Sequence, residues 1–334
     1  MKVTTVEEIA KLAGVSKATL SRVLNEKTEG VSEATRERVK KIIQDVGYTN
    51  EHFRFPANPI KMGCIALVIP DITNPFFADI VKAVEKRARE YNFTVIIANT
   101  DFSEKAELRC ISNLVLKKVD GILLIPVGAH SHTEHLIPEK YGIPLILLDR
   151  KFVDEPRWVG AYVDNSYAVF RSCEMLFQHG SRRVAMLSTR SNVSTALERI
   201  EGYRAALEHY QLPFLPELIK YGDYTVQDGY NAVLDLERAG TKFDAIFASN
   251  DLMALGALRA LAEFSYQVPQ EVEVIGFDNI LYSQYCEPPL TTIQQPTLSL
   301  GAMAFDMLLK KINGEQITES IRLLPKILIR KSTR

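Results

Sequence analysis

Residues 63–98 read GCIALVIPDITNPFFADIVKAVEKRAREYNFTVIIA, and this stretch decides the fold class. It contains an apolar run of strand length (Ile65–Ile69), a segment with helical spacing of its apolar residues (Phe77–Tyr91) and a second apolar run (Val95–Ala98). Continuous apolar strands separated by a helix are typical of parallel β-α-β units, whose sheets are covered on both faces. The stretch therefore predicts an α/β fold.

The same alternation continues towards the C-terminus. Further apolar runs of strand length follow in Gly121–Pro126, Pro144–Leu148, Val184–Ser188, Ala245–Ala248 and Val272–Gly276. Segments of helical period lie between the runs, in Glu104–Lys118, Tyr167–His179, Ser194–Tyr210 and Leu252–Phe264. Because roughly 270 residues of this pattern are more than one hydrophobic core usually organises, we expect two parallel sheets.

The N-terminal residues have a different pattern, which predicts three short helices. Thr5-Val6-Glu7-Glu8 has the form of a capping box at a helix start. Gly14 permits a sharp turn, Val15 fills the space between two helices, and Ser16 caps a second helix that ends near Asn25. This is the spacing of a helix-turn-helix, although a small three-helix bundle with a solvated face would also fit. Short or basic side chains face outward on the second helix, where such a motif meets the major groove: Lys17, Ala18, Ser21 and Arg22.

Composition excludes several classes of protein. With 46% hydrophobic and 24% charged residues, the chain is neither disordered nor fibrous. Its four cysteines lie far apart without a C-x-x-C motif, which argues against a disulfide framework and a zinc site. No signal-peptide core or run of 18 apolar residues occurs, so we expect a cytoplasmic protein that does not interact with a membrane.

Polar and aromatic side chains stand at the predicted strand ends and helix starts. Carboxylates, amides and guanidiniums there offer the planar donor and acceptor pairs that vicinal hydroxyls require: Asp149, Arg150, Arg199, Asn250, Asp278 and Gln295. Three aromatic rings could pack on the apolar face of a sugar: Phe76, Phe77 and Tyr224. We therefore expect a polyol effector in a cleft, and we count Asn74 among its residues. Asn74 and Asn250 could instead merely cap helices, and two arginines would also suit an acidic sugar derivative; purines stay possible.

The stretch His130-Ser131-His132-Thr133-Glu134-His135 is a weak candidate for a metal site. We favour the start of a solvated helix, because the sequence offers no partnering cysteine or carboxylate cluster. The motifs G-x-G-x-x-G, G-x-x-x-x-G-K-[ST] and G-x-S-x-G do not occur. We therefore expect no metal, no cofactor and no catalysis.

Residues 9–25, IAKLAGVSKATLSRVLN, resemble the head signature of the lactose/galactose repressor family of bacterial transcription regulators. The resemblance continues through Ile69–Phe77, Leu148–Arg150, Glu198–Tyr203, Ala248–Asp251, Ile275–Asp278 and Leu290–Pro296. It implies that phosphates are contacted by Thr5, Ser16, Thr19, Ser21 and Asn25. It also implies that Lys17, Ala18 and Arg22 face base edges, which agrees with the ability of arginine to bind guanine.

The resemblance further implies a division of the chain. A helix-turn-helix head (1–49) and a linker or hinge (50–61) precede a ligand-binding body (62–334) similar to periplasmic sugar-binding proteins. The body consists of two doubly wound subdomains with the ligand cleft between them. The first subdomain takes about 62–161 and 293–321, and the second takes about 162–290 and 322–334.

The linker departs from the family pattern. In the family an Ala-Arg-x-Leu stretch forms a hinge helix whose leucine enters the minor groove, whereas residues 52–58 here read HFRFPAN, with Ala57 at the leucine position. Pro56 would also break a helix interior, at a cost of about 3 kcal/mol. Either Phe53 or Phe55 replaces the leucine as the wedge, or the hinge binds differently, with both rings packed against the body.

Together these features predict a ligand-responsive, sequence-specific DNA-binding transcription regulator, most simply a repressor of a sugar or sugar-acid utilisation operon. Effector binding in the cleft would be coupled to operator affinity. A homodimer would read a pseudo-palindromic operator in double-stranded DNA, and the C-terminus carries no heptad for a tetramer. The alternatives are a solute-binding protein without a DNA role and a sugar-active α/β enzyme with an accessory head.

Overall fold

The computed structural model describes residues 10–16, 19–20, 23, 31–45, 62–155, 157–189 and 192–334. The chain divides into two compact units, Met1–Lys61 and Met62–Arg334, and we call the second unit the body. Within the described residues, no helix is long and apolar enough to cross a membrane.

The first unit has a small helical core. Residues 10–12 are helical, Gly14 turns the chain with a φ of +62°, and residues 19, 20 and 23 are helical again. The backbone N–H of Thr19 donates to Ser16 Oγ at 3.1 Å, which satisfies one of the free donors at a helix start. Helix α3 (Glu33–Asp45) follows. The buried side chains that hold these segments together are Ala10, Ala13, Leu20, Val23 and Val39.

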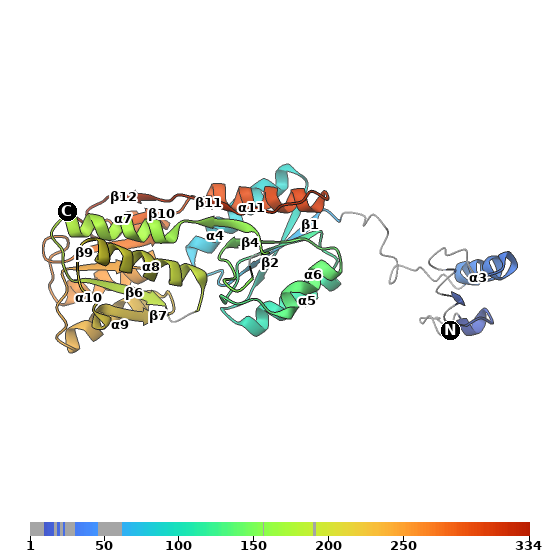
Figure 1. Cartoon of the computed structure of the whole chain (residues 1–334), viewed down its shortest axis with the longest axis horizontal. Helices are drawn as coiled ribbons and strands as arrows, with labels where there is room; N and C mark the ends of the chain where they lie inside the picture. Colours follow the sequence, from blue (N-terminus) through green and yellow to red (C-terminus); the bar gives the residue numbers. More distant parts are fainter. Residues whose placement is uncertain are drawn as a thin grey trace. The chain divides into compact units, whose positions relative to one another are not determined.

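The body contains two six-stranded sheets (Figure 1). The first sheet has the order β11-β5-β4-β3-β1-β2, and all its strands are parallel. Its strands are β1 (Cys64–Ile69), β2 (Thr94–Asn99), β3 (Gly121–Leu124), β4 (Leu145–Asp149), β5 (Gly160–Val163) and β11 (Ile321–Leu323). Its helices are α4 (Pro75–Glu90), α5 (Glu104–Leu116), α6 (Ile137–Lys140) and α11 (Thr297–Ile312), and a 3-10 turn, η2 (Thr133–Leu136), precedes α6.

The second sheet has the order β12-β10-β9-β8-β6-β7, with only the β10–β12 pair antiparallel among the described strands. Its strands are β6 (Val184–Thr189), β7 (Ile219–Gly222), β8 (Ala245–Ala248), β9 (Glu273–Asp278), β10 (Thr291–Gln294) and β12 (Lys326–Leu328). Its helices are α7 (Asn165–Gln178), α8 (Ser194–His209), α9 (Val226–Arg238) and α10 (Asp251–Glu263), with 3-10 turns at η3 (Pro216–Leu218) and η4 (Leu281–Gln284). The predicted α/β fold with two parallel sheets is therefore confirmed.

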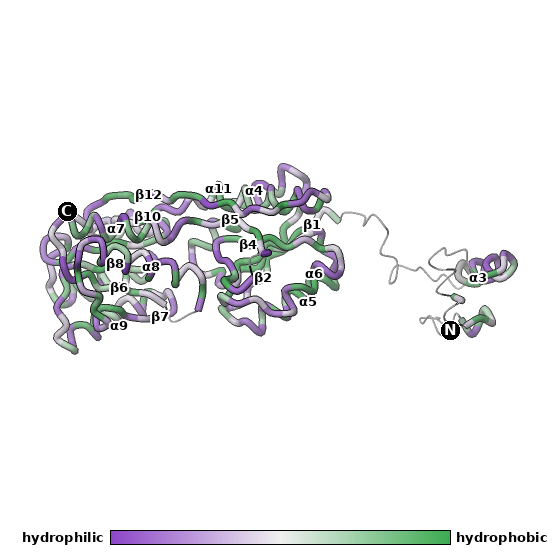
Figure 2. The backbone as a smooth tube through the Cα atoms, viewed as in Figure 1, coloured by the Kyte–Doolittle hydropathy of each residue, from purple (hydrophilic) through white to green (hydrophobic). Residues whose placement is uncertain are grey.

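Helices cover both faces of each sheet, so the central strands are buried, as their continuous apolar runs require. In β1, Ile65 and Leu67 pack towards α4 and α11, while Ala66 and Val68 pack towards α5 on the opposite face. In the second sheet α9 and α10 cover one face, and α7 and α8 cover the other. Along these helices hydrophobic and hydrophilic residues alternate, as the tube in Figure 2 shows.

The chain crosses between the two sheets three times, after Val163, Gln294 and Leu323. We expected these crossings near residues 161, 293 and 321. Each crossing lies slightly later because β5, β10 and β11 stay paired within their own sheets to their last residues. Helix α11 returns to the first sheet, where it packs against α4 and β4.

Candidate functional site

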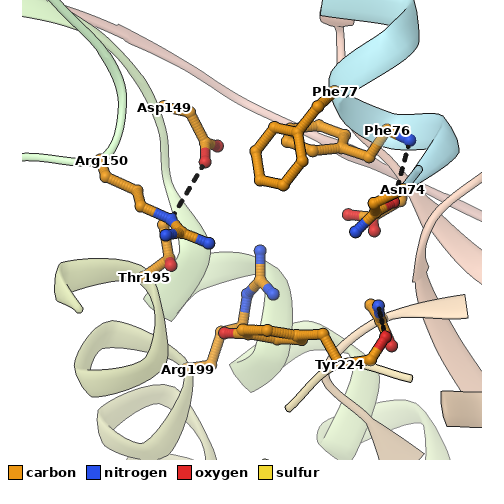
Figure 3. Close-up of a pocket in the computed structure, with 10 residues that line it drawn as sticks. Asn74, Phe76, Phe77, Asp149, Arg150, Thr195, Arg199 and Tyr224 are labelled. Carbon is orange, nitrogen blue, oxygen red and sulfur yellow. Dashed lines mark hydrogen bonds and ion pairs between the residues drawn. The ribbon is translucent and has the colours of Figure 1, made fainter. Parts of the chain in front are cut away.

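One pocket is formed at the carboxyl ends of strands from both sheets (Figure 3). The space between its walls is about 290 Å³, including the part open to solvent. The lining residues are Asn74, Phe76, Phe77, Asp149, Arg150, Thr195, Arg199, Tyr224, Asn250 and Asp278. The structure thus brings together nine of the ten side chains that the sequence placed in a cleft, and Gln295 lies behind them.

Asp149 and Arg150 come at the end of β4 and are both buried. Arg150 Nε lies 3.8 Å from Asp149 Oδ2, and Arg150 Nη1 donates to the carbonyl of Pro126 at 3.2 Å. The guanidinium also lies over the ring of Phe77, 5.6 Å from its centroid. Asp149 Oδ1 and Arg150 Nε have no hydrogen-bond partner in the described part of the chain, so both atoms are free to meet a ligand.

Arg199 projects from the first turns of α8 and is held from three sides. Its Nε donates to Asn165 Oδ1 at 3.0 Å, and its Nη1 donates to the carbonyl of Ser249 at 2.5 Å. Its guanidinium carbon lies 3.8 Å from the centroid of the Phe277 ring. These contacts fix the guanidinium before any ligand arrives.

Asp278 is the last residue of β9, and Gln295 supports it. Gln295 Nε2 donates to Asp278 Oδ1 at 2.7 Å, which leaves Gln295 Oε1 buried without a partner in the described chain. The structure therefore places Gln295 behind the carboxylate rather than among the residues that line the pocket.

The two asparagines cap helices and also line the pocket. Asn74 Oδ1 accepts from Phe76 N at 3.0 Å at the start of α4, and Asn250 Oδ1 accepts from Met253 N at 2.9 Å at the start of α10. Asn250 Nδ2 donates to the carbonyl of Tyr224, whose hydroxyl is buried without a partner in the described chain. Asn74 and Asn250 therefore do cap helices, and both side chains also line the pocket, where they can contact a ligand.

Burial dominates the electrostatics of the pocket. It raises the pKa of Asp149, against the opposing effect of Arg150 and Arg199. It also raises the pKa of Asp278 well above its usual range; Arg199 opposes this rise, while Asp251 and Asp149 add to it. Two guanidiniums and two carboxyl groups of raised pKa therefore share one small pocket.

Sequence reasoning missed several residues that build the pocket. Thr195 lines it, and Asn165 and Phe277 fix Arg199. Asn165 and Phe277 act through Arg199, which is distant from each of them along the chain, so the local sequence does not point to their role.

The histidine-rich stretch differs from expectation. His135 is buried, and the three histidines each pair with a carboxylate: Asp154 for His130, Glu104 for His132 and Glu107 for His135. The described residues contain no cluster of three metal-ligating side chains, so these pairs do not converge on one point.

Of the expected DNA-binding residues, only Ser16 and Thr19 belong to the described chain. Ser16 is exposed and Thr19 is half-buried, at the start of the second helix of the first unit. The remaining ones lie outside the described residues: Thr5, Lys17, Ala18, Ser21, Arg22, Asn25, Phe53 and Phe55.

Two family matches cover nearly the whole chain. Residues 5–51 match the bacterial regulatory proteins of the lacI family, and residues 62–330 match the periplasmic binding proteins and sugar binding domain of the LacI family. The chain belongs to the LacI family of bacterial regulatory proteins. The resemblance found in the sequence is thereby confirmed, and the protein is a DNA-binding transcription regulator of a family that does not consist of enzymes.

Full-length relatives agree with this assignment. The chain is 32% identical to the HTH-type transcriptional repressor CytR of Escherichia coli (strain K12), over 99% of this chain and 96% of CytR. The complex of the transcriptional regulator CelR with cellobiose is 31% identical and superposes with a TM-score of 0.75, over 99% of this chain and all of CelR. A LacI family regulator from Enterococcus faecium with bound ribose is 29% identical, with a TM-score of 0.71, over 81% of this chain and 98% of that chain.

Proposed function

We propose that this LacI-family regulator is a cytoplasmic repressor whose effector is a neutral single-ring sugar bound in the pocket of Figure 3. Binding of the sugar changes operator affinity, because the pocket is built from both subdomains and a ligand there favours one arrangement of them. The observation that carries the proposal is the set of buried polar atoms without partners in the described chain: Asp149 Oδ1, Arg150 Nε and Tyr224 Oη.

The charge balance of the pocket supports a neutral ligand. Burial disfavours the charged form of Asp149 and Asp278, and a carboxylate on the ligand would meet the same penalty and repulsion from these groups, whereas an uncharged polyol would not. The cellobiose and ribose in the two solved relatives support a carbohydrate.

DNA recognition is assigned to the helix-turn-helix. We infer that Thr5, Ser16, Thr19, Ser21 and Asn25 contact phosphates, and that Lys17, Ala18 and Arg22 face base edges. For the linker, we infer that Phe53 or Phe55 enters a base step in place of the family leucine.

Two copies would act together on a pseudo-palindromic operator. The edge strand β2 supports this homodimer. All six of its residues (TVIIAN) are uncharged and at least partly exposed, and Ile97 is 41% exposed in the single chain. Such an edge is prone to pair with other chains unless something covers it, and a second copy would do so.

The proposal can be tested with the single tryptophan of the chain. Trp158 packs edge-on against Phe152, with 5.7 Å between ring centroids, and Phe152 lies two residues after Arg150. The panel consists of three neutral monosaccharides (D-ribose, D-glucose and D-galactose), the sugar acid D-gluconate and the nucleoside uridine. We expect Trp158 emission to change on titration with one of the neutral monosaccharides. A response to D-gluconate alone would support a sugar acid, and a response to uridine alone would support a nucleoside.

A further inference from the structure

We propose that Glu107 and His135 are positioning residues that hold Arg150 in its place in the pocket, although neither of them lines it. The proposal rests on the proposed function, because it gives the pair a purpose in preparing the effector site. Its evidence is a continuous path of contacts through two loops, 126–135 and 150–158.

The pair is fully buried, with both side chains 1% exposed. His135 Nδ1 accepts from the backbone N–H of His132 at 2.8 Å, so the ring proton lies on Nε2. Nε2 donates to Glu107 Oε1 at 3.0 Å, and Glu107 Oε2 accepts from the backbone N–H of Val127 at 2.9 Å. Both oxygens of Glu107 therefore accept, which is the bonding pattern of a carboxylate.

The first branch of the path passes through the backbone to Arg150. Val127 directly follows Pro126, whose carbonyl accepts from Arg150 Nη1 at 3.2 Å. Fixing Val127 thus fixes the acceptor that orients the guanidinium.

The second branch passes through aromatic rings. The His135 ring lies 4.6 Å from the Phe152 ring, and Phe152 contacts Trp158 in turn. Close by, Val153 N donates to the carbonyl of Ala129 at 2.8 Å, which ties the two loops together. The loop that carries Arg150 is therefore held by His135 on one side and by residues 126–129 on the other.

Stability alone does not account for a buried carboxylate of this kind. Within the described chain its side-chain partner is His135, whose Nδ1 accepts a hydrogen bond, and replacing buried polar pairs by apolar groups is often neutral or stabilising. The two carboxylate oxygens of Glu107 instead accept from Val127 N–H and from His135 Nε2 at fixed points, as a positioning group requires.

The chain offers a matched control. Glu104 stands one turn earlier on α5 and pairs with His132, three residues before His135, at 2.5 Å. The side chains of this second pair are 53% and 38% exposed, and the pair has the same chemistry. Glu104→Gln therefore changes the same charge on the same helix at an exposed position, and it leaves Glu107 and the groups that donate to it unchanged.

The test compares Glu107→Gln and the charge-retaining Glu107→Asp with Glu104→Gln in the full chain without added sugar. The Glu107→Gln amide cannot accept at both positions, so one donor, Val127 N–H or His135 Nε2–H, loses its partner. Three readouts follow the loops: amide hydrogen exchange of residues 126–129 and 150–153, quenching of Trp158 by acrylamide, and labelling of Arg150 by phenylglyoxal.

For both Glu107 variants we expect at least tenfold faster exchange in the two loops, stronger Trp158 quenching and labelling of Arg150. Glu104→Gln should behave like the wild type, and exchange in β1 and α4 should stay unchanged in all variants. Unaltered loops, or equal acceleration across the whole first sheet including global unfolding, would overturn the positioning role. Because no sugar is added, the result does not depend on whether the proposed effector is correct.

Discussion

Asp149 and Asp278 occupy equivalent positions in the two halves of the body. Each is the last residue of the strand that stands third in the spatial order of its sheet, counted from β11 for β4 and from β12 for β9. Each is buried and has a positive φ, 64° for Asp149 and 112° for Asp278, which is unfavourable for a residue with a side chain. The two carboxyl groups therefore face one pocket from unfavourable backbone conformations at matching strand ends.

The raised pKa values of these two carboxyl groups predict how the effector affinity changes with pH. A neutral sugar donates hydroxyl protons best to ionised carboxylates, so its affinity should increase as the pH rises through the pKa values of Asp149 and Asp278. An acidic sugar should show the opposite trend, because ionised carboxylates repel it. Calorimetric titration in buffers of different ionisation enthalpy measures this directly: proton release is expected, and proton uptake would indicate an acidic ligand.

Arg199→Ala should affect more than the effector site. Besides lining the pocket, Arg199 donates to Asn165 Oδ1 and to the carbonyl of Ser249. Leaving these buried groups unpaired should lower the free energy of unfolding by about 2–4 kcal/mol. Urea denaturation followed by circular dichroism checks this, and wild-type stability would show that the contacts are dispensable.

Asp251 should make the body less stable as the pH rises. Burial raises the pKa of Asp251 to about 7, while Thr292 Oγ1 and the backbone N–H of Ile280 donate to its carboxyl group. Between the ordinary pKa of about 4 and this value, the folded state holds a proton that the unfolded state has lost, so stability falls with increasing pH. Between pH 5 and pH 8, the free energy of unfolding of Asp251→Asn should rise by on the order of 2 kcal/mol relative to that of the wild type. A difference between the two proteins that stays constant with pH would exclude this contribution.

The linker prediction concerns residues outside the described chain. If an aromatic ring enters a base step, Phe55→Ala, or otherwise Phe53→Ala, should weaken operator binding and reduce DNA bending, whereas Ala57→Leu should do little beside Pro56. Circular-permutation gel shifts measure the bend. Wild-type bending and affinity in both alanine variants would mean that neither ring acts as a wedge.

The elements that the sequence predicted best are the buried ones. The run Ala245–Ala248 coincides with β8, because a central strand of a parallel sheet is apolar on both faces. The strands β7, β11 and β12 were not predicted from apolar runs, since they lie at sheet edges and contain exposed residues. The edge strand β2 was predicted, because its residues Val95–Ala98 form a continuous apolar run.

The sequence also predicted some residues of the candidate site and its surroundings better than others. Asp149 and Asp278 could be anticipated because strand ends of parallel sheets meet at one edge. The burial of His135 could not, because it depends on Glu107, which lies 28 residues earlier in the chain. Whether the predicted pocket residues bind an effector stays a prediction.

The most direct test of the central claim measures operator affinity of the full chain with and without sugar. Fluorescence anisotropy with an operator selected from random DNA would compare the wild type with Asp278→Asn, each at saturating concentrations of the monosaccharide that changes Trp158 emission. The account predicts at least a tenfold change in operator affinity for the wild type, and little or no change for Asp278→Asn at the same sugar concentration. An equal change in both proteins, or no change with any neutral sugar, would contradict it.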